Sequence, residues 1–253
     1  MMDASATIRP MLPIADENEP GQGPAIVTLA LIAANVLVFL LLQQAGGDAN
    51  FTYGWSAVPL EITTGMDLTA AVPITVDGQS YQLPQAPGPD PIQLTLLSSM
   101  FMHAGWLHLG GNMLFLWIFG DNVEHRAGRI PYLLAYLAAG VVGSLTQIWS
   151  DPESPIPTLG ASGAISGVLG AYLVLFPRNR VTVILIRFLT QVPALVAIGV
   201  WIVLQLVNGL GATVVSDSGG GVAYLAHIGG FGVGVLVGLL FRAIPTQPRR
   251  AWP

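Results

Sequence analysis

A serine between two glycines is the first feature of the sequence that could do chemistry. Ser162 stands in the run Gly160-Ala161-Ser162-Gly163, where an apolar stretch begins after a short acidic segment. A serine hydroxyl is a weak nucleophile and needs a base within hydrogen-bonding distance before it can attack a carbonyl carbon. So short a motif also occurs in glycine-rich packing faces. Ser162 therefore indicates acyl transfer only if the rest of the chain supplies the other groups.

Two further apolar stretches carry groups of the kind this chemistry needs. His227 precedes the glycine pair that ends at Gly230 and could be the general base. His108 and Asn112 are four residues apart, so they share one face of a helix. Both can donate hydrogen bonds to an oxyanion, together with the backbone N–H of Ser162. These four residues predict hydrolysis or transfer of an acyl group.

A third catalytic member and a metal site are the alternatives to a simple pair. No Asp or Glu lies inside an apolar stretch, so a third member could come only from a connection, where Asp217 is a candidate. A zinc site needs about three protein ligands. Without any cysteine, the histidines available within apolar stretches are His103, His108 and His227, while His125 stands among arginines. We expect a Ser–His dyad, with no metal and no cofactor.

The composition indicates that these groups lie in a membrane. The chain has 253 residues, of which 53% are hydrophobic and 9% charged, and its mean hydropathy is +0.65. In soluble domains, roughly a quarter of all residues are charged. Six uncharged stretches are each long enough for the ~20 residues that cross a bilayer. We predict an all-α membrane protein whose six transmembrane helices cover about residues 24–44, 96–118, 130–149, 160–177, 188–209 and 222–241.

The charges predict how the six helices are oriented. The chain has no lysine, and its nine arginines all lie before the first predicted span, after the sixth, or in the second and fourth connections. The positive-inside rule makes these parts, and both termini, cytoplasmic. The expected organisation is a flexible tail over 1–23, a membrane domain over 24–242 with an external loop over 45–95, and a cytoplasmic tail over 243–253. The net charge of −5 comes with acidic external connections, and we expect no nucleic-acid partner.

The helix rise predicts that the polar groups lie at one depth. Ser162 and His227 stand 16 and 15 residues before the arginines that follow their helices. At ~1.5 Å per residue, they lie ~24 and ~22 Å above those arginines, and His108 lies at ~20 Å with Asn112 a turn lower. Glycines at 230, 234 and 238 form a small-xxx-small pattern that suits close helix packing. We therefore expect the nucleophile and the base to meet in the outer half of the membrane.

These three motifs, on the second, fourth and sixth helices, resemble those of the rhomboid intramembrane serine proteases. The resemblance covers roughly residues 24–242. It implies a six-helix bundle with a water-accessible dyad below the outer membrane surface, acting on peptide bonds in or near transmembrane segments of membrane proteins. It also implies a bacterial cytoplasmic (inner) membrane location, with the active site toward the extracytoplasmic side. Substrates and the lipid bilayer are then the expected partners.

The resemblance assigns a role to each residue of the motifs. Ser162 would be the nucleophile and His227 the general base, while His108, Asn112 and the Ser162 N–H would bind the oxyanion. The supporting residues would be His103, Gly160, Gly163 and Gly230. Ser166 stands where many members carry an aromatic residue beneath the catalytic histidine, so we expect Tyr224 or Phe231 to support the imidazole. The external loop also lacks the arginine of a Trp-Arg feature found in many relatives.

Two other functions remain possible at this point. A catalytically silent rhomboid-like protein would bind membrane clients without cleaving them, although it would have no need of both Ser162 and His227. A small transporter would be expected to show internal repeats or paired broken helices, and the sequence has no convincing repeat. The glycine-rich fifth connection is expected to form a mobile cap over the site.

Overall fold

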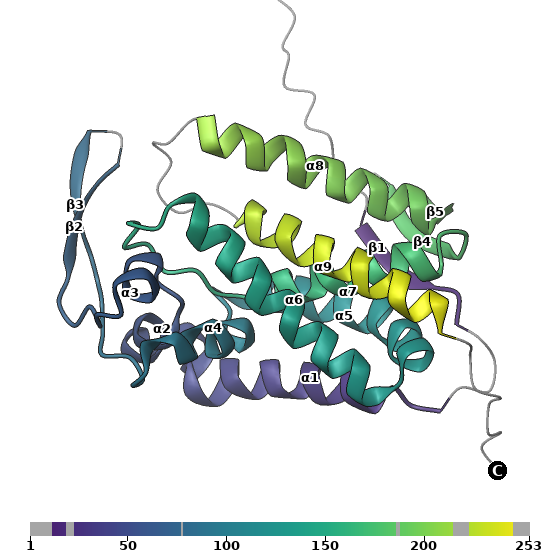
Figure 1. The fold of residues 1–253 in the computed structure, drawn as a ribbon, viewed down its shortest axis with the longest axis horizontal. Coiled ribbons are helices and arrows are strands. Elements are labelled where there is room, and N and C mark those ends of the chain that lie inside the picture. Colours follow the sequence, from purple (N-terminus) through teal and green to yellow (C-terminus); the bar gives the residue numbers. More distant parts are fainter. Residues whose placement is uncertain (1–11, 19–22, 77, 186–187, 215–222, 245–253) are drawn as a thin grey trace, which may run out of the picture.

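The apolar stretches of the sequence form a bundle of six long helices (Figure 1). The computed structural model describes residues 12–18, 23–76, 78–185, 188–214 and 223–244. The fifth connection, including Asp217, and most of both tails lie outside these described residues. The helices of the bundle are α1 (Ile26–Leu37), α5 (Trp106–Ala127), α6 (Arg129–Ser150), α7 (Ser162–Leu175), α8 (Ala194–Val214) and α9 (Tyr224–Ala243).

Helix α7, which begins at Ser162, is the centre of the bundle. It packs against α5, α6 and α9, and its residues from Gly163 to Tyr172 are all buried. Helix α1 packs mainly on α5, and α8 packs mainly on α9, so these two helices lie along opposite edges of the bundle (Figure 1). The serine is therefore carried by the helix that the rest of the bundle surrounds.

Glycines allow α7 and α9 to approach until their backbones touch. A Cβ on Gly230 would overlap the carbonyl oxygen of Gly163, and a Cβ on Gly234 would overlap that of Gly167. Glycines spaced by four residues lie on one helix face, which lets two backbones pack without intervening side chains. The small-xxx-small pattern predicted this kind of contact, and it brings the start of α7 beside the start of α9.

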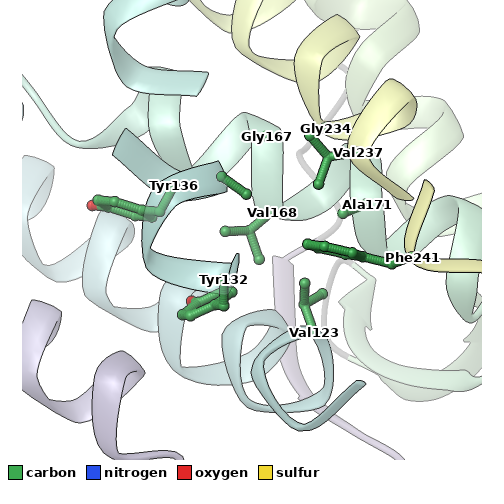
Figure 2. Close-up of a pocket in the computed structure, with 10 residues that line it drawn as sticks. Val123, Tyr132, Tyr136, Gly167, Val168, Ala171, Gly234, Val237 and Phe241 are labelled. Carbon is green, nitrogen blue, oxygen red and sulfur yellow. The ribbon is translucent and has the colours of Figure 1, made fainter. Parts of the chain in front are cut away.

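A small apolar cavity lies between α5, α6, α7 and α9, further along α7 than Ser162 (Figure 2). Tyr132, Tyr136, Val168 and Phe241 are among the residues that line it. Neither Ser162 nor any histidine lines this cavity. It belongs to the packing of the bundle, and the candidate active site lies elsewhere.

Two helices among the described residues are long and apolar enough to cross a bilayer on length and composition. These are α6 and α9, with mean hydropathies of 1.4 and 1.8 in their most apolar windows. Shorter apolar helices cover 26–42, 92–101, 162–175 and 194–209. Helix α7 has 14 residues, which span only ~21 Å at 1.5 Å per residue, against ~30 Å for the hydrocarbon core. The chain is thus mostly helical, and it stays a prediction that six of its helices cross the membrane.

The first long connection, expected as an external loop over 45–95, has structure of its own. Helix α1 continues as a π-helix, η1 (Val38–Leu42), and a 3₁₀ turn, η2 (Gln44–Gly46), before two short helices, α2 (Ala49–Trp55) and α3 (Pro59–Thr64). Asp48 caps α2 by accepting the N–H of Phe51 at 2.9 Å. An antiparallel hairpin of β2 (Val72–Val76) and β3 (Gln79–Leu83) then projects from this end of the bundle (Figure 1).

The helix expected over 96–118 is divided into two parts. Three short turns, η3 (Ile92–Leu94), α4 (Thr95–Ser98) and η4 (Ser99–Phe101), precede a non-helical segment at 102–105, and α5 begins only at Trp106. The buried side chain of Gln43 holds this non-helical segment: its Oε1 accepts the N–H of His103 at 2.8 Å and its Nε2 donates to the His103 carbonyl at 3.1 Å. These side-chain bonds satisfy the backbone polar groups that a continuous helix would have paired internally.

The all-α expectation is too narrow, because a second sheet lies at the end of the bundle opposite the β2–β3 hairpin (Figure 1). It consists of β1 (Leu12–Asp16), β4 (Arg180–Leu185) and β5 (Phe188–Pro193), antiparallel in the order β1-β4-β5. In β4, Val181 and Val183 are buried and alternate with more exposed residues, which is the period of a strand. Within the expected tail, residues 12–16 are thus a strand, and the helix expected from 188 starts at Ala194.

The carboxyl group of Asp16 anchors β1 to the helices. Its Oδ2 accepts hydrogen bonds from the hydroxyl of Tyr172 at 2.6 Å and from Nδ2 of Asn122 at 2.7 Å. Burial raises the pKa of Asp16 to about 6, an effect that the charge of Asp121 reinforces and these two hydrogen bonds oppose. The neutral acid is therefore favoured in the folded chain, relative to an unfolded chain with a pKa of 3.8.

The attachment of β1 is expected to weaken as the pH rises. Because the folded pKa of Asp16 lies above the unfolded value, its contribution to stability is complete below about pH 4 and is lost as the pH rises through about 6. Amide hydrogen exchange of β1, corrected for the intrinsic rate, should therefore show less protection at pH 7.5 than at pH 5. Asp16→Asn should remove this difference. Equal protection of the wild-type strand at both pH values would contradict the assignment.

Candidate active site

The hydroxyl of Ser162 and the imidazole of His227 are in direct contact. Ser162 begins α7 and His227 lies in the first turn of α9, and the distance from Ser162 Oγ to His227 Nε2 is 2.8 Å. Ser162 is half-buried, while the side chain of His227 is 7% exposed. The glycine contacts between α7 and α9 make this approach possible. A serine and a base at this distance form the arrangement that activates a nucleophile.

The second ring nitrogen of His227 is also paired. His227 Nδ1 lies 2.7 Å from Oε1 of Gln205, which projects from α8. A neutral imidazole carries one N–H. An N–H on Nδ1 that donates to Gln205 leaves the lone pair of Nε2 free to accept the proton of Ser162. The hydrogen bonds on both sides of the ring are consistent with one tautomer, the one that a general base requires.

Aromatic side chains surround the imidazole of His227. The ring of Trp201, on α8, has its centroid 5.9 Å from that of the imidazole, and Tyr224 meets it edge-on at 6.5 Å. Phe231 packs on Trp201 at 6.4 Å. Of the two residues expected to support the imidazole, Tyr224 contacts it directly, whereas Phe231 packs on Trp201. Trp201, which was not expected, is closer to the imidazole than Tyr224. Ser166 points elsewhere, donating its hydroxyl to the carbonyl of Ser162 at 2.6 Å.

His108 lies against Gly160, two residues before Ser162. A Cβ on Gly160 would stand 2.8 Å from His108 Cε1, 2.9 Å from His108 Nε2 and 3.7 Å from Ser162 Oγ. Gly160 also has a φ of +129°, which side-chain-bearing residues rarely adopt. His108 Nδ1 accepts the N–H of Ala104 at 3.3 Å, so the ring proton is on Nε2, which lies on the edge of the ring next to Gly160. His108 can therefore donate a hydrogen bond beside the serine.

Asn112 offers a second donor one turn further along α5. Its side chain is 8% exposed, and Nδ2 is buried without a protein acceptor. A buried amide donor with no partner is costly, which makes this N–H available to a bound group. The first N–H groups of α7 also have no acceptor within the helix. Side-chain and backbone donors thus accompany the Ser162–His227 pair.

The remaining expected site residues lie at buried positions around the Ser162–His227 pair. His103 is fully buried, its ring meets that of His108 edge-on at 5.0 Å, and neither of its ring nitrogens has a protein partner. Gly163 and Gly230 lie at the α7–α9 contact, where Gly230 cannot carry a side chain.

Among the described residues, no group of three or more His, Cys, Asp or Glu side chains could hold a metal ion.

Gln43, Trp201 and Gln205 are the site residues that the sequence analysis missed. Each is a residue without a motif around it, and each acts through a contact between distant parts of the chain. The spacing of Trp201 and Gln205, four residues apart in a stretch expected to be helical, was the only available signal. It places both side chains on one helix face without saying what that face meets.

Comparison with known proteins gives one family. The Rhomboid domain profile matches residues 92–244, which is more than half of the chain. Rhomboid protein 1, mitochondrial, of Saccharomyces cerevisiae is 32% identical over 163 residues, covering 62% of this chain and 45% of that protein. Rhomboid protease GluP of Bacillus subtilis is 34% identical over 158 residues, covering 62% of this chain and 26% of that protein.

A third relative matches a shorter region. Putative rhomboid protease YdcA of Bacillus subtilis is 36% identical over 87 residues, covering 34% of this chain and 43% of that protein. The chain thus spans less than half of the length of each of these curated relatives. Two of the three are named as proteases.

Proposed function

Because the chain belongs to the rhomboid family, we propose that it is an intramembrane serine endopeptidase that hydrolyses peptide bonds in or near transmembrane segments of membrane proteins. The observation that carries this proposal is the 2.8 Å contact between Ser162 Oγ and His227 Nε2. The two groups come from different helices and are half-buried or buried, as expected of a catalytic pair rather than of a surface hydrogen bond.

The reaction follows from the geometry of this pair. Ser162 Oγ attacks the scissile carbonyl carbon while its proton moves to His227 Nε2. The protonated imidazole then gives this proton to the leaving amine, and an acyl-enzyme on Ser162 remains. A water molecule, deprotonated by the same nitrogen, hydrolyses the ester and restores the serine. The dyad needs no metal or cofactor for these steps.

His108, Asn112 and the backbone N–H of Ser162 form the proposed oxyanion site. Negative charge develops on the carbonyl oxygen in the transition state, and donors already in place stabilise it without reorganisation. The ring proton of His108 is on Nε2, which lies next to Gly160, and Asn112 Nδ2 has no competing protein acceptor. Two donors from α5 and one from the start of α7 would therefore surround the oxyanion.

The proposed membrane arrangement is a six-helix bundle in a bacterial cytoplasmic membrane with both termini inside. The arginine pattern supports this orientation. Arg126 and Arg129 flank the turn between α5 and α6, and Arg180 begins β4. That turn and β4 both lie at the end of the bundle opposite the β2–β3 hairpin (Figure 1). The short α7 starts at Ser162, so water could reach the dyad from the extracytoplasmic side, where the bundle carries its acidic first connection.

Gly160→Ala is expected to lower kcat/KM by about 100-fold or more, the scale of losing an oxyanion donor. A methyl group at this position would meet the His108 ring at 2.8 Å and would be strained at a φ of +129°. Gly111→Ala is the control, because it lies on the same helix as His108 and its Cβ would meet nothing within 4 Å. Both variants would be compared in a substrate-cleavage assay. Equal activity of Gly160→Ala and Gly111→Ala would contradict the assigned position of His108.

Cleavage of a model transmembrane substrate in liposomes tests the proposed function. Wild-type protein should release a product cut in or near the membrane segment, and Ser162→Ala should reduce this to background. Ser166→Ala is the matched control, since its hydroxyl bonds only to the backbone of the same helix, and it should cleave at close to the wild-type rate. A folded wild-type protein that binds such substrates without cleaving them would contradict the proposal and favour a silent client-binding protein.

A further inference from the structure

Helix α8 provides two side chains that contact the imidazole of His227. Trp201 packs on the ring with a centroid distance of 5.9 Å, and Oε1 of Gln205 lies 2.7 Å from Nδ1. Residues four positions apart share one face of a helix. The same face of α8 therefore contacts both the imidazole ring and the Nδ1 atom of the proposed general base.

The contact with Gln205 determines which nitrogen of His227 carries the proton. Nε2 can accept the serine proton only if the neutral ring carries its hydrogen on Nδ1. An acceptor at Nδ1 favours this tautomer, fixes the ring orientation and stabilises the imidazolium that forms during attack. The orienting group here is an uncharged amide, and its oxygen avoids the high cost of placing an ionised carboxylate at this depth in a membrane.

The hydrogen bond between Gln205 and His227 exists only while α8 is packed against α9. Helix α8 lies at the edge of the bundle, packs mainly on α9, and has only minor contact with α7 (Figure 1). The Ser162–His227 contact is held by the α7–α9 glycines and does not involve α8. A displacement of α8 would therefore leave the serine and histidine side by side but remove the acceptor at Nδ1.

We propose that Gln205 is a positioning residue for hydrolysis, which holds His227 in the base-competent tautomer through an amide oxygen supplied by α8. This inference rests on the proposed function. Gln205 is then the third member of a Ser162–His227–Gln205 hydrogen-bond chain. The reactivity of Ser162 consequently depends on how α8 packs against α9.

Two variants of the same length separate hydrogen bonding from packing. Gln205→Met fills the same volume without an acceptor for Nδ1–H, whereas Gln205→Glu, as the neutral acid that burial favours, keeps a carbonyl oxygen at that position. An unpaired buried donor costs about 1–3 kcal/mol, and 1.4 kcal/mol is tenfold in rate, so Gln205→Met should lower kcat by about 10- to 100-fold. Gln205→Glu should retain most of the activity. Asn208→Met is the control, because Asn208 is an exposed residue on the same helix.

The experiment measures kcat and KM for a transmembrane substrate in liposomes, and the rate at which a small fluorophosphonate labels Ser162. For Gln205→Met we expect kcat and the labelling rate to fall together while KM stays near the wild-type value, because a small probe does not need a substrate-entry path. Restoration of both rates in Gln205→Glu completes the expected pattern. Thermal midpoints check that each variant is folded; should Gln205→Met be unfolded, Gln205→Asn, which withdraws the acceptor by one methylene, takes its place.

Three results would overturn the inference: unchanged rates in Gln205→Met, an effect confined to KM, or activity that Met preserves and Glu removes, which is the pattern of a packing role. Failure of the proposed function is distinguishable from these, because it would appear as absent cleavage and labelling in the wild-type protein. Active wild-type protein with an equally active Gln205→Met variant would remove the role of Gln205 and leave the dyad intact.

Discussion

Replacing His227 by alanine is expected to lower kcat for substrate cleavage by at least ~10,000-fold, as removal of one member of a serine–histidine pair does in other hydrolases. The reason is that Ser162 Oγ has its contact with a base at His227 Nε2, at 2.8 Å. Without this base, the hydroxyl must lose its proton to water within a largely buried site. Initial rates of cleavage of a transmembrane substrate measure the effect.

Non-additivity provides the control for this prediction. When two residues act as one catalytic unit, removing either of them lowers the rate about as much as removing both. The double variant Ser162→Ala/His227→Ala should therefore cleave no more slowly than either single variant. His125→Ala is the matched histidine control, because His125 contacts the backbone oxygens of Asp121 and Gly23, at the far end of α5 from His108. A His227→Ala variant that is folded and cleaves at a rate near the wild type would show that the base lies elsewhere.

Gly234→Ala is expected to have the largest effect on stability. Its new methyl group would overlap the backbone of Gly167, and backbone cannot rotate away as a side chain can. Overpacking costs about 1–3 kcal/mol and occasionally more. At the upper end of this range, the thermal midpoint of a chain this size should fall by about 10 °C. Because α7 and α9 must separate, cleavage activity should fall as well.

Gly232→Ala is the matched control for the helix contact. Gly232 lies two residues away on the same helix, and a Cβ there would meet nothing within 4 Å. Thermal unfolding in detergent, followed by the loss of soluble protein, compares the two variants with the wild type. A midpoint for Gly234→Ala equal to that of Gly232→Ala would mean that α7 and α9 are not packed backbone to backbone.

The meeting of Ser162 with His227 could be predicted from the sequence because it depends on quantities that the sequence contains. Helix rise and the spacing to flanking arginines give the depth of each residue, and the glycine spacing on one helix indicates a close neighbour. His108 followed from the same reasoning, and the structure has it beside Gly160. The catalytic roles of these residues stay predictions until they are tested by substitution.

The sheet of β1, β4 and β5 could not be predicted in the same way. Residues 12–16 have no pattern that distinguishes a strand from a tail, because β1 forms by pairing with β4, more than 160 positions away. For β5, the uncharged residues from Phe188 continue into α8, and a short uncharged, largely apolar run does not distinguish a strand from a helix. Pro193 at the junction was the available signal.

The residues that contact His227 also could not be predicted, because they come from a different helix. Ser166 indicated that no aromatic residue of α7 supports the imidazole, but the replacement could not be identified from spacing within one helix. Trp201 and Gln205 come from α8, and their role depends on how far α8 rotates about its axis when it packs on α9. Periodicity gives the residues that share a face and leaves the neighbour of that face open.

The most direct test of the account is mass spectrometry of the intact protein after reaction with a fluorophosphonate. The account predicts one covalent adduct, on Ser162, formed by wild-type protein in the membrane and absent from His227→Ala, because the phosphorus centre reacts only with a serine whose proton a neighbouring base removes. No adduct on folded wild-type protein, or an adduct that forms equally well without His227, would contradict the claim that these two side chains act as a catalytic pair.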